Sequence, residues 1–286
     1  MNVVISPNPY RDKQFKHTMR VKQMLEESGV TTKICLPFQV DQVFELPQDI
    51  VFADMLQSLD DCDVLICLGG DGTILHASKL AAARDIPILG INIGTLGFMA
   101  ELEAWNLQSL KTLKDCTYKI EERMMLEVNV ISGDKVIYTD YALNDAVITK
   151  GAVARVLQMK VCCNDSEVQS FSGDGVILST PTGSTAYSLS AGGPIVEPTA
   201  ENILITPICA HGPNTNCIVT APSRVVSVTV DRTGRRNAFL SVDGGRTFRL
   251  DANDKVTVKR AERVTKLIRL SDQDFFQTIT RKFSSR

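Results

Sequence analysis

The chain has 286 residues and a mass of 31.4 kDa, a size that usually makes about two domains. Its 31 Lys and Arg residues nearly balance 33 Asp and Glu residues. The resulting net charge of −2 excludes a general electrostatic attraction to nucleic acid or to an anionic membrane. With 44% hydrophobic and 22% charged residues, the composition is typical of a globular protein, which at this length folds without a disulfide or a structural metal.

Targeting and membrane segments are not expected. Residues 1–13 include the polar residues Asn2, Ser6, Asn8 and Arg11 and two prolines. No uninterrupted apolar stretch follows them, so a signal peptide is not predicted. The longest apolar passage, residues 86–100, is interrupted by Asn92 and three glycines, which makes it too short to span a bilayer.

The cysteines predict a reducing compartment. No two of them form a Cys-x-x-Cys pair, so we expect free, buried thiols in a cytoplasmic protein rather than zinc ligands or disulfides. They are Cys35, Cys62, Cys67, Cys116, Cys162, Cys163, Cys209 and Cys217.

The first third of the chain alternates between strand and helix patterns. Residues 2–6 and 63–68 are short apolar runs that predict buried strands, and residues 86–93 predict a third. Residues 16–27 have helical spacing and end before Gly29, and residues 73–84 form an Ala- and Leu-rich helix. This order indicates an α/β domain with a parallel sheet.

From residue 118 the pattern changes to short alternating strands. They are expected at residues 126–130, 136–138, 156–161, 224–230, 238–242 and 255–259, separated by Gly-, Asn- and Asp-rich turns. This pattern is typical of an antiparallel β domain.

The C-terminus returns to a helical pattern. Ser271 and Asp274 resemble a capping box, and Phe275, Phe276 and Ile279 form an apolar helical face. We therefore predict an α/β domain over residues 1–120, an antiparallel β-sandwich-like domain over 121–264, and a tail over 265–286 that packs back on the first domain.

The sharpest local motif is Leu-Gly-Gly-Asp-Gly-Thr at residues 68–73, between a buried strand and a helix. Its glycines allow close approach of the backbone to a ligand, and Thr73 is the predicted N-cap of a helix whose N-terminus favours phosphate. Asp71 would repel a phosphate unless a cation is present or the carboxylate accepts a proton. A tight strand-to-helix turn with a surface aspartate remains the alternative.

Two further segments carry polar groups in unusual surroundings. Residues 172–194 combine hydroxyls and glycines with a Val-Ile-Leu strand, which indicates hydrogen-bond donors around a polar ligand, with Tyr187 able to stack on a flat ring. Asn144 and Asp145 interrupt an apolar run, and vicinal sugar hydroxyls are natural partners for them. A Ser/Thr-rich surface loop and an ordinary Asn-Asp turn are the respective alternatives.

Several common motifs are missing from the sequence. It has no Walker-type Gly-x-x-x-x-Gly-Lys-Ser/Thr, no Rossmann fingerprint after a strand and no Gly-x-Ser-x-Gly. The three histidines, His17, His76 and His211, are too far apart in sequence to suggest a metal triad.

Together the motifs resemble those of the NAD kinase family. The Gly69-to-Thr73 motif is shared with diacylglycerol, sphingosine and phosphofructokinases, whereas Gly-Asp-Gly at 173–175 with Thr-Pro-Thr-Gly-Ser-Thr-Ala-Tyr at 180–187 is specific. The resemblance runs from Gly69 to Gly244. It implies an α/β domain and a β domain with the active site between them, in a homodimer or homotetramer.

The resemblance also implies the reaction. The γ-phosphate of ATP would pass to the 2′-hydroxyl of the adenosine ribose of NAD, giving NADP. Inorganic polyphosphate could be the donor in place of ATP. Asp71 would be the base, Gly72 would hold diphosphate, and Mg²⁺ would arrive with ATP rather than in a fixed protein site. Asn144 and Asp145 would hold ribose hydroxyls, and Asp174 would contact the nicotinamide end.

By the same resemblance, the residues that bind NAD or ATP are Asp71, Gly72, His76, Asn144, Asp145, Arg155, Asp174, Thr182, Thr185, Ala186, Tyr187 and Ser190. A second group of candidates is Gly69, Gly70, Thr73, Phe98, Ser172, Cys209 and Gly244. For Phe98, a role in the hydrophobic core is the alternative to packing on a base.

The sequence departs from the family pattern at four places. Asp145 stands where Glu is more usual, His76 where Arg or Lys is frequent, and Ser172 where many bacterial members have Arg. Asn216 and Cys217 replace a frequent Arg-Pro. These departures leave the choice between NAD and NADH, and the phosphate donor, open.

Two other functions remain to be weighed. A lipid kinase of the same superfamily needs a basic or apolar membrane-facing surface, which the −2 charge and the Tyr187 segment argue against. A dinucleotide-sensing regulator without activity gains nothing from a carboxylate beside phosphates, so Asp71 argues against it. The expected partners are NAD and ATP, with neither nucleic acid nor membrane.

Overall fold

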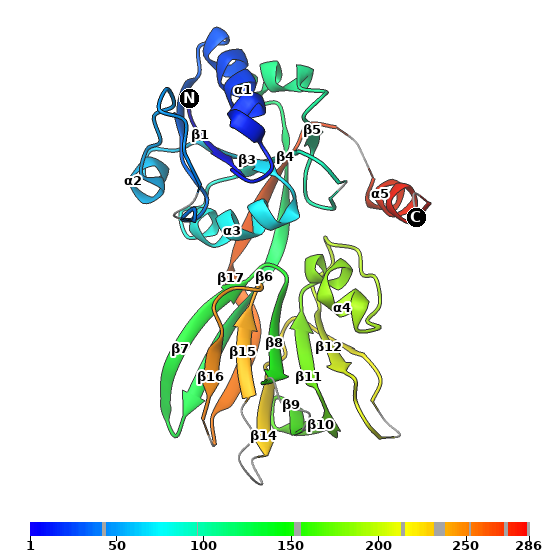
Figure 1. The fold of residues 1–286 in the computed structure, drawn as a ribbon. Helices are drawn as coiled ribbons and strands as arrows, with labels where there is room; N and C mark the ends of the chain where they lie inside the picture. The colour runs from blue at the N-terminus through cyan, green and yellow to red at the C-terminus, as the bar shows by residue number, and fades with distance from the viewer. Residues whose placement is uncertain are drawn as a thin grey trace. The chain divides into compact units, whose positions relative to one another are not determined.

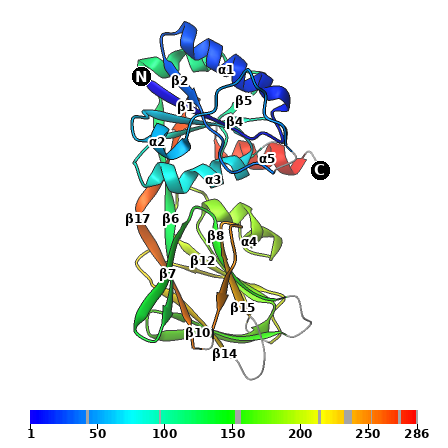
Figure 2. The same ribbon diagram turned by 60° about the vertical axis from the view of Figure 1, so that its left-hand side comes forward.

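The computed structural model describes residues 1–41, 44–95, 97–151, 156–212, 215–231, 238–251, 253–271 and 274–284. The chain divides into two compact units (Figures 1 and 2). The first comprises Met1–Glu122 together with Val264–Arg286, and the second comprises Arg123–Arg263.

The first unit is built on a parallel sheet. Its strands are ordered β2-β1-β3-β4, and every neighbouring pair is parallel. They are β1 (Asn2–Pro7), β2 (Thr31–Ile34), β3 (Val64–Gly69) and β4 (Ile88–Asn92). The short β5 (Leu102–Glu103) and the end of β17 (Lys255–Arg269) pair with β4, also in parallel. Strands β3 and β4 are buried along their whole length, which confirms the predicted parallel α/β arrangement.

Helices cover both faces of this sheet. Figures 1 and 2 show α1 (Lys16–Glu27) on one face and α3 (Asp71–Ala82) on the other. Val21 and Leu25 of α1 belong to the same hydrophobic cluster as Val3 and Ile66 of the sheet. The remaining helical segments of this unit are η1 (Lys13–Phe15), α2 (Met55–Leu59), η2 (Gln108–Asp115) and α5 (Phe275–Ser284).

Two predicted helix starts are wrong. Helix α3 begins at Asp71 with Gly70 as its N-cap, so Thr73 lies inside the first turn and is not the cap. Helix α5 begins at Phe275, where the Asp274 carboxylate accepts a hydrogen bond from Phe276 N at 3.4 Å. The Ser271 hydroxyl instead donates to Glu101 Oε1 at 2.7 Å, because this segment is tied to the end of the sheet.

The second unit consists of antiparallel strands. One run is β10-β9-β14-β17 and the other is β13-β12-β11-β8-β15-β16. The strands are β8 (Asp145–Lys150), β9 (Leu157–Cys163), β10 (Ser166–Gly173), β11 (Gly175–Ser179), β12 (Ile203–Ile208), β13 (Ile218–Thr220), β14 (Val226–Asp231), β15 (Ala238–Val242) and β16 (Phe248–Leu250). A hairpin of β6 (Lys119–Ser132) and β7 (Lys135–Ala142) joins β17.

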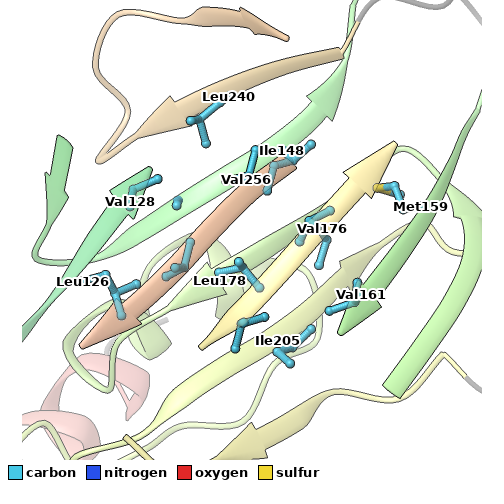
Figure 3. Close-up of a cluster of buried hydrophobic side chains, with 14 of the residues drawn as sticks. Leu126, Val128, Ile148, Met159, Val161, Val176, Leu178, Ile205, Leu240 and Val256 are labelled. Carbon is cyan, nitrogen blue, oxygen red and sulfur yellow. The ribbon is translucent and has the colours of Figure 1, made fainter. Parts of the chain in front are cut away.

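The two runs share one hydrophobic core, shown in Figure 3. Val161 of β9 and Val256 of β17 come from the first run, while Val176 of β11 and Leu240 of β15 come from the second. Alternate residues of facing sheets therefore fill a common interior, which confirms the predicted antiparallel sandwich. Two short helical segments, η3 (Thr182–Thr185) and α4 (Tyr187–Ser190), follow β11.

The cysteines follow the prediction only in part. All eight are free, and burial raises the pKa of the Cys67 thiol. Cys116 and Cys209 are exposed, however, so the prediction that the thiols are uniformly buried is wrong. Cys209 lies in the bend after β12 with a φ of 45°, a value that is uncommon for a residue other than glycine. Within the described residues, no helix has both the length and the apolar character needed to cross a membrane.

Candidate active site

The glycine motif of the first unit lies at the carboxyl end of the parallel strands. Strand β3 ends at Gly69, and Gly70 then adopts an extended conformation as it leads into α3. A Cβ at Gly69 would meet Thr73 Oγ1 at 2.1 Å, so the glycine lets the Thr73 side chain fold back over the strand end. In open α/β sheets this edge is where ligands bind.

Asp71 is fixed by backbone amides. Its carboxylate accepts hydrogen bonds from Phe98 N at 2.8 Å and from Met99 N at 3.0 Å, one to each oxygen. A Cβ at Gly97 would lie 2.2 Å from Asp71 Oδ1, so only glycine at 97 permits this approach. Each oxygen accepts only one of these two bonds, which leaves lone pairs to accept a proton from a ligand hydroxyl.

The segment that holds Asp71 is itself anchored. Arg269 Nη1 donates to the Met99 carbonyl at 3.2 Å, and its Nη2 donates to Glu121 Oε1 at 2.9 Å. The Glu101 carboxylate accepts from Leu270 N and from Ser271. The two amides that contact Asp71 therefore belong to a loop tied down by the C-terminal segment.

The other predicted residues of the first unit have mixed surroundings. Gly72 is exposed, and a Cβ there would meet nothing within 4 Å, so the space over the helix N-terminus is open. The His76 ring is exposed and lies 5.2 Å from the Phe38 ring. Two residues of α5 lie against the Phe98 ring. The Phe275 ring centroid is 6.3 Å from that of Phe98, and the Lys282 Nζ atom is 3.9 Å from the Phe98 ring centroid.

In the second unit, Asn144 and Asp145 are organised by Asp243, a residue of the turn after β15 to which the sequence motifs assign no role. The Asp243 carboxylate accepts hydrogen bonds from the backbone N of Leu143, Asn144 and Asp145 at 2.8, 2.8 and 3.0 Å. Asp243 N donates in return to the Asp145 carbonyl at 2.9 Å. These reciprocal bonds fix the backbone that carries the Asn144 and Asp145 side chains.

Burial raises the pKa of the Asp145 carboxyl to about 7, and the nearby negative charge of Asp243 adds to the effect. The Asp145 residue is only 5% exposed. Ribose hydroxyls that donate to this carboxylate would restore hydrogen bonds lost on burial.

The Thr-Pro-Thr-Gly-Ser-Thr segment packs against this pair. A Cβ at Gly183 would meet the Asn144 carbonyl oxygen at 2.1 Å, so glycine permits the contact. The Thr180 hydroxyl donates to the Leu143 carbonyl at 2.5 Å, and Thr182 Oγ1 accepts from the buried Arg123 at 3.2 Å. These two hydroxyls join the segment to neighbouring parts of the second unit.

Most of the remaining residues of this segment are at least partly exposed, although the Thr185 hydroxyl donates to the Thr182 carbonyl at 3.2 Å. Tyr187 is 46% exposed, Ser190 is exposed, and Thr185 and Ala186 are half-buried. The Ser184 and Ser188 hydroxyls, by contrast, bond internally to Val196 and Thr206.

A second group of predicted residues lies at the other end of β8 and β11. Asp174 forms an ion pair with Lys150 at 2.6 Å, and the Ser172 hydroxyl donates to Gln158 Oε1 at 2.5 Å. Cys209 adjoins them, since a Cβ at Gly173 would meet the Cys209 carbonyl at 3.4 Å. In the pairing of β8 with β11, Asp145 lies opposite Ser179 and Thr149 lies opposite Gly175. Asp174, which precedes Gly175, therefore lies at the far end of β8 from Asp145. The two residues are separated by the length of β8, about 17 Å at 3.3 Å per residue.

Gly244 follows Asp243 in an exposed turn with a φ of 66°, whereas Arg155 lies outside the described residues. The described part of the chain contains no cluster of three or more His, Cys, Asp or Glu side chains placed to bind a metal ion.

Comparison with known proteins covers nearly the whole chain. Residues 3–117 match the model of the ATP-NAD kinase N-terminal domain, and residues 143–270 match that of the ATP-NAD kinase C-terminal domain. The NAD kinase of Caldanaerobacter subterraneus subsp. tengcongensis is 44% identical over 78% of this chain and 79% of its own length. That of Acetivibrio thermocellus is 34% identical over 100% of this chain and 98% of its own.

Solved structures agree. Yeast NADH kinase complexed with NADH has a TM-score of 0.85 and 25% identity, covering 99% of this chain and 87% of that one. An NAD kinase from Archaeoglobus fulgidus in complex with ATP has a TM-score of 0.76 and 22% identity over 100% of both chains, a likeness of fold. Because both family models match and relatives above 30% identity span the full length, this chain belongs to the ATP-NAD kinase family.

Proposed function

We propose that the protein transfers the γ-phosphate of ATP to the 2′-hydroxyl of the adenosine ribose of NAD, giving NADP and ADP. Family membership supports the reaction class. The observation that carries the mechanism is the Asp71 carboxylate, held by the amides of Phe98 and Met99 beside an open helix N-terminus.

In this reaction the 2′-hydroxyl oxygen forms a bond to the γ-phosphorus, and the bond from that phosphorus to the bridging β–γ oxygen breaks. The hydroxyl proton passes to Asp71, and ADP leaves with the electron pair of the broken bond. A carboxylate placed in advance by backbone donors requires no reorganisation when the proton arrives. Phosphoryl transfer depends mainly on positioning of this kind.

The divalent cation belongs to the substrate. Mg²⁺ would enter bound to the phosphates of ATP, as the family resemblance implies. When bound it neutralises phosphate charge that Asp71 would otherwise repel. Inorganic polyphosphate offers the same phosphates without the nucleoside and is the alternative donor.

The second unit binds the acceptor. Asn144 and Asp145 hold ribose hydroxyls. The adenine and ribose pocket is lined by residues that are at least partly exposed, namely Thr185, Ala186, Tyr187 and Ser190. Asp174, about 17 Å along β8 from Asp145, contacts the nicotinamide end.

The free cysteines support a reducing, cytoplasmic location, and the family resemblance supports a homodimer or homotetramer. Cell fractionation and light scattering of the purified protein test these two inferences.

The test of function is direct. Wild-type protein mixed with NAD, ATP and Mg²⁺ is expected to form NADP, measured with an NADP-specific dehydrogenase. Asp71→Asn keeps the side chain's size and removes its basicity, so kcat is expected to fall at least about 100-fold while NAD affinity stays within about threefold. An Asp71→Asn variant with wild-type kcat would refute the base assignment. Dinucleotide binding without turnover in the wild type would favour a sensor.

A further inference from the structure

A single arginine lies over the glycine motif. Arg11 belongs to the loop after β1, which neighbours the loop after β3 because β1 and β3 are adjacent parallel strands. Asn8 N donates to the Leu68 carbonyl at 2.7 Å, and the Asn8 carbonyl accepts from the backbone N of Arg11 at 3.1 Å and of Asp12 at 3.0 Å. The Arg11 backbone is thus tied to the end of β3.

The far end of this loop is equally fixed. The buried Asp12 carboxylate accepts from His17 N at 3.0 Å, from Thr18 N at 2.8 Å and from the Thr18 hydroxyl at 2.6 Å. It therefore anchors the start of α1. Arg11 stands between two anchored residues, Asn8 and Asp12, while its own residue is exposed.

The Arg11 guanidinium lies against two glycines. A Cβ at Gly70 would meet Arg11 Nη1 at 3.0 Å, and a Cβ at Gly94 would meet the same atom at 3.6 Å. Gly70 is the N-cap of α3, which precedes Asp71, and Gly94 follows β4 with a φ of +122°. The absence of side chains at both positions leaves the guanidinium room above the motif.

The Arg11 charge has no carboxylate partner within the described part of the chain. Among the residues that the structure describes, none offers the Arg11 side chain a hydrogen bond or an ion pair. Asp71, the nearest acidic residue in the motif, is bonded to the amides of residues 98 and 99. The fork of guanidinium N–H donors beside the loop therefore remains available to a ligand, and its geometry matches phosphate oxygens.

We propose that Arg11 binds the phosphate chain of the phosphoryl donor. The inference rests on the proposed function and adds a residue that the sequence motifs did not identify. Asp71, the proposed base for the hydroxyl that attacks the γ-phosphorus, lies in the motif beside Arg11, so the proposed reaction brings the donor's phosphates to this motif. Neutralising the donor's terminal phosphates there lowers the repulsion that Asp71 exerts on them.

Binding measurements test this without requiring turnover. Inorganic tripolyphosphate and a non-hydrolysable ATP analogue, each with Mg²⁺, are titrated calorimetrically into the wild type, Arg11→Ala, Arg11→Lys and the control Arg20→Ala. Arg20 is an exposed arginine on α1, outside the site. Replacing it with alanine changes the net charge by the same amount as Arg11→Ala. Loss of charge-assisted hydrogen bonds is expected to weaken both ligands roughly 10- to 100-fold in Arg11→Ala, less in Arg11→Lys and not in Arg20→Ala.

Kinetics separate donor from acceptor. In Arg11→Ala, kcat/KM is expected to fall by a similar factor with ATP and with polyphosphate, while KM for NAD changes less than about threefold and the melting temperature is retained. Unchanged binding of tripolyphosphate by Arg11→Ala would overturn the proposal. So would an equal loss of affinity for NAD, or a fall in kcat/KM that is seen with ATP but not with polyphosphate. If tripolyphosphate binds through Arg11 but no NADP forms in the wild type, the phosphate site stands and the proposed function fails.

Discussion

Gly97→Ala is expected to disable the enzyme while leaving it folded. The added methyl group would lie 2.2 Å from Asp71 Oδ1 and 2.8 Å from its carboxyl carbon. Carbon and oxygen atoms in ordinary contact are about 3.4 Å apart, so the Asp71 carboxylate must move by about 1 Å. A displacement of that size at a reacting group lowers the rate about 100-fold.

The same displacement weakens the two hydrogen bonds that Asp71 accepts from Phe98 N and Met99 N. Hydrogen bonds to charged groups contribute about 1.5–3 kcal/mol each, so we expect a loss of roughly 2–4 kcal/mol in the free energy of unfolding. Urea denaturation measures this loss, and the coupled NADP assay measures kcat on the folded protein.

The matched control is Gly133→Ala. Gly133 lies in the β6–β7 turn with a φ of +59°, and an added Cβ would contact nothing within 4 Å. This variant is destabilised by about 1 kcal/mol of backbone strain, but kcat is expected to stay at the wild-type level. If Gly97→Ala retained more than about a third of wild-type kcat, the position of Asp71 between these amides would not matter for the reaction.

Two further predictions concern the second unit. Asp243→Ala removes the acceptor of three backbone hydrogen bonds, so we expect the free energy of unfolding to drop by about 2–4 kcal/mol. We also expect KM for NAD to rise more than KM for ATP. Equal rises in the two KM values would refute the role of Asp243 in organising the NAD-binding residues Asn144 and Asp145. The raised pKa of Asp145, about 7 against 3.8 unfolded, means that the folded protein retains a proton that the unfolded chain releases between those pH values. Stability should therefore fall as pH rises from about 4 to 7, by up to about 1.4 kcal/mol per pH unit, and Asp145→Asn should abolish that contribution. Urea denaturation from pH 4.5 to 8 checks it, and an unchanged slope in the variant would contradict it.

Element type was predictable wherever periodicity was strong. Strand β3 reads as a continuous apolar run because both of its faces are covered, and α1 reads as a helix because its buried residues recur at helical spacing. The start of α3 was missed because Thr73 looks like a cap, whereas the glycines before it allow the helix to begin at Asp71. Local capping preference was overridden by close packing at Gly69.

The candidate site was predictable only where several residues act together. The hydroxyl-rich segment was noticed as a whole, but the sequence does not separate Thr182, which bonds internally to Arg123, from the outward-facing Tyr187. Asp243 and Arg11 were not identified because a single charged residue in a turn has no periodicity. Their significance comes from long-range neighbours, such as residues 143–145 for Asp243.

Backbone amides position the carboxylates of Asp71 and Asp243. Asp71 is held by the amides of residues 98 and 99, and Asp243 by those of residues 143–145. An arginine in their place would hold a carboxylate firmly but would also neutralise it, which lowers its ability to take a proton or to attract a hydroxyl. Amide donors fix the direction of the carboxylate without placing a full positive charge beside it. Such a contact requires the chain to approach closely, and that explains why glycine stands at position 97, where any side chain would displace Asp71.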